Sequence, residues 1–161
     1  MRINIARVVL GGLIIGATRL ILGGLFRGLI LVPLFGQEIR ENHPSLISSV
    51  EATPGKIGMV VIMMLIGIVT MYTYAAMRPQ FATRLAAVCS AAFAVWFLAS
   101  LNWAITAVMG LFSWRHIIVE CLLTLVTVLV ATYLGSRVYP DADRPRSASA
   151  ARLSPAANIA T

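Results

Sequence analysis

Two arginines lie within the first long apolar stretch of the sequence, and one glutamate lies within the last. Arg19 and Arg27 interrupt residues 8–35, and Glu120 interrupts residues 117–139. A charged side chain in hydrocarbon is costly, and it persists where it faces a protein interior, a wet cavity or a partner of opposite charge. Glu120 is the only acid within any apolar stretch, so it requires such a partner or stays protonated. These residues are therefore the candidates for an ion pair, a polar passage or an anion site.

Helical spacing gathers these residues with small and polar side chains. At about 100° per residue, both arginines share a helix face with Gly12, Gly16 and Gly23. Gly24 and Gly28 form a neighbouring small-xxx-small strip. Small residues on one face allow another helix to approach closely. The last stretch has a polar stripe of its own: Ser113, His116, Glu120, Thr124, Thr127, Ala131 and Gly135. We therefore expect helix packing at these glycines and a polar cluster between the two faces.

Matching depths predict the partner of Arg27. In a chain that threads back and forth, the first and last stretches run in opposite directions. Arg27 and Glu120 then each lie about 10 Å outward of the midpoint of their own helix, at a rise of about 1.5 Å per residue. We predict an Arg27–Glu120 ion pair, with His116 one turn above it on the same face. Such a pair can fix helix register.

Arg19 is the charged residue without an obvious partner. It lies near mid-membrane, level with Thr124 and Thr127, whose hydroxyls can accept hydrogen bonds but cannot neutralise it. One interpretation is structural, with hydroxyls, carbonyls and trapped water around the guanidinium. Another is a polar passage or anion site centred on Arg19, because intramembrane charges usually mark such a path. A partner subunit, a lipid headgroup and a bound cofactor are the remaining alternatives.

His116 and Glu120 are also spaced i,i+4, which can place two metal ligands on one face of a helix. Two ligands without a third are a weak signal, so we expect neither a metal ion nor a cofactor. The sequence has no HExxH, no Cys-x-x-Cys pair, no phosphate loop and no nucleophile beside a base. We therefore predict that the protein is not an enzyme. A membrane enzyme or cofactor binder that uses these two residues is the alternative.

Four apolar stretches must position these side chains. Each is long enough to cross a bilayer, which takes roughly 20 residues of helix, and they cover residues 8–35, 57–77, 85–111 and 117–139. Of the 161 residues, 59% are hydrophobic and 12% are charged, whereas a soluble domain carries about 25% charged residues. The predicted fold class is all-α, a four-transmembrane-helix bundle in residues 1–139. We expect a disordered cytoplasmic tail in residues 140–161.

The basic residues indicate orientation rather than a nucleic-acid partner. The net charge is +7, but the arginines surround the spans without forming a basic face. One side of the membrane receives eight of them: Arg2, Arg7, Arg78, Arg84, Arg137, Arg144, Arg146 and Arg152. The other side receives Arg40, Lys56 and Arg115. Arg40 and Lys56 lie in an outer loop at 37–56, which we expect to hold a short helix near 46–50. The positive-inside rule then predicts that both termini are cytoplasmic. The first stretch exceeds a signal-peptide core of roughly 7–15 residues, so we expect a retained anchor.

Two segments carry a family resemblance. The opening reads Asn4-Ile5-Ala6-Arg7-Val8-Val9-Leu10-Gly11-Gly12-Leu13, and the last span closes with Val119-Glu120, Ala131-Thr132-Tyr133-Leu134-Gly135 and Tyr139. In these segments, and loosely over its whole length, the chain resembles a group of small bacterial four-helix integral membrane proteins of unknown function. That family usually carries an Asn, a Glu and an Asn in its first helix, where this chain has Leu20, Gly23 and Arg27. The resemblance implies the fold and a bacterial inner membrane, but no mechanism.

Two functions follow from the sequence besides the enzyme alternative. The first is a non-catalytic accessory or scaffold subunit of a larger membrane complex, docked through the glycine strips and the tail. The second is a small oligomeric transporter or channel that moves an anion or protons past Arg19, Arg27 and Glu120. The helices lack the Pro/Gly-interrupted pairs common in transporters, which favours the first. The expected partners are the lipid bilayer and other membrane subunits or a second copy, and not nucleic acid.

Overall fold

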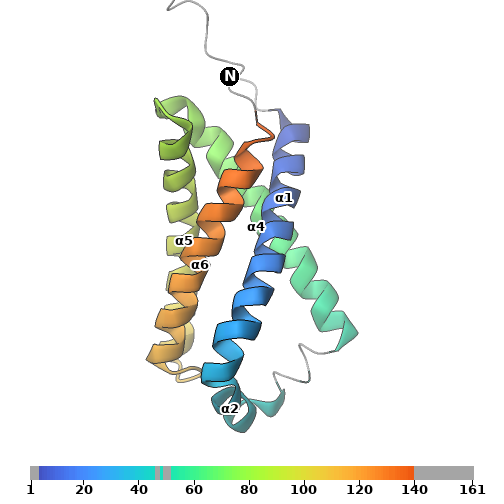
Figure 1. Ribbon diagram of the computed structural model, residues 1–161, viewed down its shortest axis with the longest axis vertical. Coiled ribbons are helices and arrows are strands. Elements are labelled where there is room, and N and C mark those ends of the chain that lie inside the picture. Colours follow the sequence, from blue (N-terminus) through green and yellow to red (C-terminus); the bar gives the residue numbers. More distant parts are fainter. Residues whose placement is uncertain (1–3, 46–47, 49–51, 140–161) are drawn as a thin grey trace, which may run out of the picture.

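The protein is all-helical within the residues that the structure, a computed structural model, describes: 4–45, 48 and 52–139. Four helices are long and apolar enough to cross a membrane (Figure 1): Ile5–Asn42, Thr53–Gln80, Arg84–Val108 and Trp114–Ser136. The predicted class, an all-α bundle with four spanning helices, is confirmed. The predicted tail at 140–161 lies outside the described residues, as does most of the predicted short helix at 46–50.

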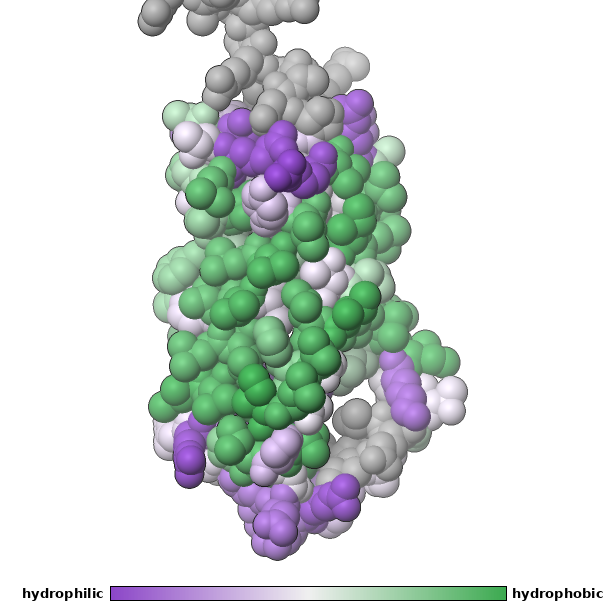
Figure 2. Space-filling view, in the orientation of Figure 1, coloured by the Kyte–Doolittle hydropathy of each residue, from purple (hydrophilic) through white to green (hydrophobic). Residues whose placement is uncertain are grey.

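The surface has the distribution of polarity that a bilayer requires. Figure 2 shows hydrophobic residues over the middle of the visible face and hydrophilic residues toward its two ends. Side chains in the middle of the spanning helices are exposed although they are large and apolar, for example Val61 on the second helix and Leu98 on the third. The chain is therefore a multi-pass membrane protein.

The first membrane helix is longer than predicted and has three parts. They are α1 at Ile5–Phe26, a π-helical segment η1 at Arg27–Leu31, and α2 at Val32–Asn42. The predicted span ended at residue 35, whereas α2 remains helical to Asn42. Pro33 lies in the first turn of α2, where a missing N–H costs little. There the chain bends, and α2 turns across the end of the bundle (Figure 1).

The remaining elements are α4, the 3-10 turn η2, α5 and α6, which cover Thr53–Met77, Arg78–Gln80, Arg84–Val108 and Trp114–Ser136. Local capping sets the ends of the last two helices. The Thr83 hydroxyl accepts a hydrogen bond from the Ala86 N–H at 3.2 Å, and the Ser113 hydroxyl accepts one from the His116 N–H at 3.4 Å. The turn after α5 uses Gly110, whose φ of 73° suits a residue without a Cβ.

Glycines bring three helices together in one half of the bundle, which we call the packed half. A Cβ added at Gly67 of α4 would collide with the Gly12 carbonyl oxygen of α1. A Cβ added at Gly135 of α6 would lie 2.8 Å from the Gly11 carbonyl oxygen and would also meet Ile15. Membrane helices associate through such close backbone contacts. The hydrophobic core lies around them: Val8, Ile15, Met71, Tyr74, Ala75, Ala87, Val88, Ala91 and Ala131.

The other half of α1 and α4 is open. The buried residues of α1 end at Gly16, and those of α4 begin at Gly67. Figure 1 shows the first half of α4 diverging from α1 toward the end of the bundle where α2 lies. By contrast, α6 has buried residues along its whole length, from His116 to Ser136. We call the second half of α1 and the first half of α4 the open half.

Candidate functional site

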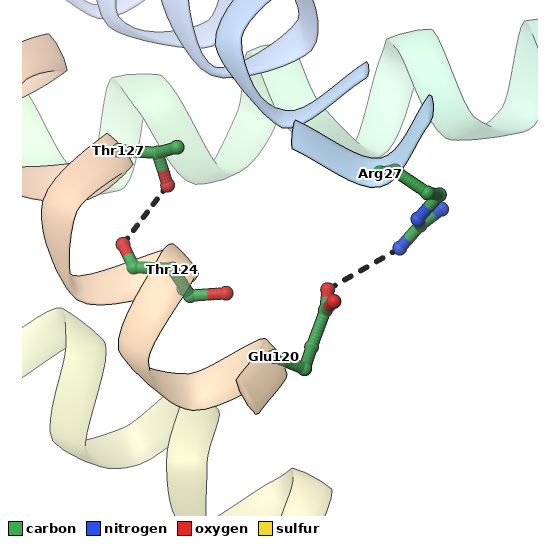
Figure 3. A network of polar contacts seen from close by, with 4 residues as sticks. All are labelled: Arg27, Glu120, Thr124 and Thr127. Atoms are coloured by element: carbon green, nitrogen blue, oxygen red, sulfur yellow. Dashed lines mark hydrogen bonds and ion pairs between the residues drawn. The ribbon is translucent and has the colours of Figure 1, made fainter. Parts of the chain in front are cut away.

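An ion pair links the first and last membrane helices. The Arg27 Nη2 atom lies 3.3 Å from the Glu120 Oε1 atom and donates a hydrogen bond to it (Figure 3). The side chain of Glu120 is 12% exposed, whereas that of Arg27 is 46% exposed. The carboxylate is therefore held inside the helix interface, while part of the guanidinium faces outward.

The backbone around Arg27 departs from a regular α-helix. Arg27 is the first residue of η1, and its carbonyl accepts a hydrogen bond from the Val32 N–H, five residues further along the chain. Such π-helical turns are rare, and they occur frequently at functional sites. Pro33 follows directly and has no N–H to donate. The result is a widened turn that begins at the residue that holds Glu120.

A cleft adjoins this ion pair. Its volume is about 210 Å³ including its open side, and its lining comes from α1, η1 and α6: Gly23, Phe26, Arg27, Leu31, Glu120, Leu123, Thr124 and Thr127. The Thr127 hydroxyl donates a hydrogen bond to the Thr124 carbonyl at 2.9 Å, so its proton is used within α6 (Figure 3). The cleft presents a guanidinium, a carboxylate and hydroxyls on an apolar background.

Arg19 does not take part in the ion pair. Its Nη1 atom is buried and has no hydrogen-bond partner among the described residues. The predicted acceptors, the hydroxyls of Thr124 and Thr127, make no recorded bond to it, and Thr127 donates within its own helix. A buried polar group costs free energy unless it is hydrogen-bonded, and a buried charge costs more. Arg19 is thus held in the bundle with one guanidinium nitrogen that no described residue satisfies.

His116 lies among aromatic rings rather than in the cleft. It is 5% exposed, and its ring centroid lies 4.8 Å from that of Phe35 and 5.1 Å from that of Phe112. Phe35 belongs to α2, so the bend at Pro33 places its ring against that of His116. Sequence reasoning missed both phenylalanines, because they are distant from each other in the chain. Both phenylalanines lie near the outer ends of predicted spans, and this shared depth was the signal that could have identified them.

The two potential metal ligands on α6 gain no third ligand from the described residues. No group of three or more His, Cys, Asp or Glu side chains lies together within that part of the chain. Glu120 lines the cleft and is bound to Arg27, whereas His116 is packed against aromatic rings.

The predicted packing glycines fall into two groups. Gly12, Gly16 and Gly135 contact other helices in the packed half. An added Cβ would meet nothing within 4 Å at the other three, which are Gly23, Gly24 and Gly28. No described helix packs on them, because α4 has diverged from α1 at that level. Gly23 lines the cleft instead.

Two further glycines complete the packed half and were missed from the sequence. Gly11 adjoins the predicted strip, but its contact with α6 depends on how the helices are rotated. Gly67 lies in a methionine-rich helix, where it forms no small-xxx-small pair with another glycine. A Cβ at either position would lie within 3 Å of a neighbouring helix. Isolated glycines in long apolar helices were the signal that could have identified them.

The fold and this site together define a multi-pass α-helical membrane protein with an ion pair between its first and last spanning helices. No protein-family model, characterised protein or solved structure matches the chain. The resemblance to small bacterial four-helix membrane proteins therefore stays a prediction, and a function can be argued only from the geometry.

Proposed function

We propose that this protein is a non-catalytic accessory or scaffold subunit of a larger membrane complex. The open half supports this proposal most. About 20 Å of α4, at 1.5 Å per residue, precede its first buried residue, Gly67. Membrane helices gain stability from close packing and polar contacts with other helices rather than from contact with lipid. Within the described residues, α1 and α4 diverge beside glycines where an added Cβ would meet nothing within 4 Å and beside the buried Arg19 Nη1 atom, which has no hydrogen-bond partner there. Such a surface suits half of a helix interface.

We further propose a place and an orientation in the cell. The support for orientation is the charge distribution: Arg7, Arg78, Arg84 and Arg137 flank one end of the bundle, whereas Arg40, Lys56 and Arg115 flank the other. The end with more arginines would face the cytoplasm. A bacterial inner membrane is the location that the family resemblance favours.

Photocrosslinking in native membranes tests the subunit proposal. A photoreactive benzoylphenylalanine replaces Val61, which lies in the open half and is 51% exposed. The matched control replaces Leu98 on α5, which is 68% exposed to the bilayer. We expect a protein adduct from Val61 and lipid adducts alone from Leu98. Lipid adducts alone at both positions, together with migration as a monomer on native gels, would contradict the proposal.

The cleft supports a second candidate, a small oligomeric transporter or channel for an anion or protons. A half-exposed guanidinium beside a carboxylate can serve as a first site for a charged solute. The cleft itself is short: its lining comes from Gly23–Leu31 and Glu120–Thr127 alone. Beyond the cleft, α1 and α6 are in close backbone contact in the packed half. A complete path would therefore require several copies of the chain.

Flux measurements in liposomes separate this candidate from the first. Protein reconstituted at high density is assayed for chloride and proton movement, with Arg19→Ala and Arg27→Ala as variants. A transporter loses flux in at least one variant. Flux equal to that of empty liposomes, or flux unaffected by both substitutions, rejects it.

A further inference from the structure

The first apolar stretch contains two arginines, and Glu120 is the only acid in any of the four stretches, so one of these two cations lacks a counter-charge. The Glu120 carboxylate is bound to Arg27 at 3.3 Å. The Arg19 Nη1 atom is buried without a hydrogen-bond partner among the described residues. Of the two hydroxyls predicted to lie level with it, those of Thr124 and Thr127, the second donates within its own helix. The unpaired charge is therefore Arg19.

Arg19 lies at the boundary between the packed and open halves. Residues three and four apart lie on one side of a helix, so Arg19 is between Gly16 and Gly23 on α1. A Cβ at Gly16 would lie 2.9 Å from the Met63 carbonyl oxygen of α4, whereas one at Gly23 would meet nothing within 4 Å. Contact between α1 and α4 thus ends within one turn of Arg19, where the open half begins.

We propose that the open half is occupied, in the assembled complex, by a transmembrane helix of a different protein that carries an aspartate or glutamate at the depth of Arg19. This inference rests on the proposed subunit function and names the chemistry of the partner. The carboxylate pairs with the guanidinium, and Gly23 and Gly24, where an added Cβ would meet nothing within 4 Å, let the helix approach closely. The cost of burying Arg19 is then offset by the ion pair in the complex.

Depth and charge distinguish this partner from the other candidates. Arg19 is about 21 Å along α1 from Ile5, at 1.5 Å per residue. That is near the middle of a hydrocarbon core of about 30 Å, so lipid phosphates lie about 15 Å away on either side. A second copy offers Glu120 as its acid in an apolar stretch, and that carboxylate already binds Arg27 of its own chain. A separate membrane protein is the remaining source of an acid at this depth.

The test uses the full-length chain in native membranes, with the photoreactive residue at Val61. Three backgrounds are compared: Arg19→Leu, Arg19→Lys and the control Arg7→Leu, which removes an exposed arginine outside the apolar stretch. We expect Arg19→Leu to lower the yield of the protein adduct at least tenfold. Arg19→Lys should retain most of the adduct, and Arg7→Leu all of it. Mass spectrometry of the adduct should identify a spanning segment that contains an aspartate or glutamate.

A stability measurement on the purified chain separates this role from a purely structural one. Removing an unpaired guanidinium should leave the unfolding temperature of the isolated Arg19→Leu variant unchanged or higher. A guanidinium satisfied within its own chain would instead make that temperature fall. In the complex, replacing Arg19 with an acid should abolish the protein adduct, and so should replacing the partner's acid with a base. The two replacements together should restore the adduct.

The outcomes separate the two proposals. A protein adduct at Val61 that is insensitive to Arg19→Leu overturns the acidic partner and leaves the subunit function standing. An adduct to a second copy of the chain, or to a segment without an acid, overturns it as well. Lipid adducts alone at Val61 in the unmodified background overturn the subunit function itself.

Discussion

At the scale of single residues, the two members of the ion pair are unequal. The Glu120 side chain is 12% exposed and that of Arg27 is 46% exposed. Removal of Arg27 leaves a carboxylate enclosed in the helix interface without its counter-charge. Removal of Glu120 leaves a long, half-exposed cation that can extend along the cleft toward the end of the bundle. The pair should therefore respond asymmetrically to substitution.

We predict that Arg27→Leu lowers the free energy of unfolding by about 2 kcal/mol, and Glu120→Gln by about 1 kcal/mol or less. Breaking a fully buried pair costs about 3–5 kcal/mol, and the exposure of Arg27 reduces that value. Equilibrium unfolding in mixed micelles measures both. The double variant Arg27→Leu/Glu120→Leu is the control and should be more stable than Arg27→Leu alone. Equal losses in the two single variants would contradict the asymmetry.

The contact between Arg27 and Glu120 could be predicted from the sequence, because the depth of a residue in the membrane follows from its position along the helix. Sequence reasoning did not find a partner for Arg19, because the predicted hydroxyls of Thr124 and Thr127 do not bond its Nη1 atom within the described residues. It also did not find the rings around His116, because the bend that brings Phe35 there depends on hydrogen bonds of η1 that no hydrophobic pattern records. The predicted first span ended at residue 35, whereas the helix continues to Asn42.

At the scale of elements, two glycines on the same helix have opposite surroundings. Gly67 lies where α4 crosses α1, and an added Cβ would collide with the Gly12 carbonyl oxygen. Gly58 lies in the open half of α4, where an added Cβ meets nothing within 4 Å. The two glycines are nine residues apart, so at about 100° per residue they lie on opposite faces of α4. The sequence separates the two faces, but which face meets α1 is decided by tertiary packing. The four spans themselves were predictable, since length and hydropathy alone identify them.

We predict that Gly67→Ala destabilises the isolated protein by about 2 kcal/mol, because overpacking a tight contact costs about 1–3 kcal/mol. Gly58→Ala is the matched control on the same helix. It should leave stability unchanged or raise it by up to about 1 kcal/mol through helix propensity. Thermal unfolding in detergent compares the two. Similar melting temperatures for both variants would show that α1 and α4 are not in backbone contact at Gly67.

At the scale of the whole molecule, the two ends of the bundle differ in structure and in charge. The turn η2 and the described ends of the chain lie at the packed end, while α2 crosses the other (Figure 1). Arg40 is on the surface of α2 and Gln80 is in η2, and both are exposed. The two positions therefore report on opposite sides of the membrane.

We predict that a membrane-impermeant maleimide labels Arg40→Cys in intact cells and labels Gln80→Cys only after the membrane is opened. Both variants are made in a background without the native Cys89 and Cys121. The reason is the positive-inside rule, which places the arginine-rich end in the cytoplasm. Labelling of Gln80→Cys alone in intact cells would reverse the proposed orientation, and labelling of both would indicate two orientations.

The backbone contacts of α1 have a consequence for biogenesis. Gly12 and Gly16 meet α4, whereas Gly11 and Ile15 meet Gly135, close to the end of α6. The docking sites of α1, the first spanning helix, are therefore filled only when α6, the fourth, has been made and inserted. Until Gly135 reaches the membrane, the nascent helices present an unfilled surface to the translocon and its chaperones.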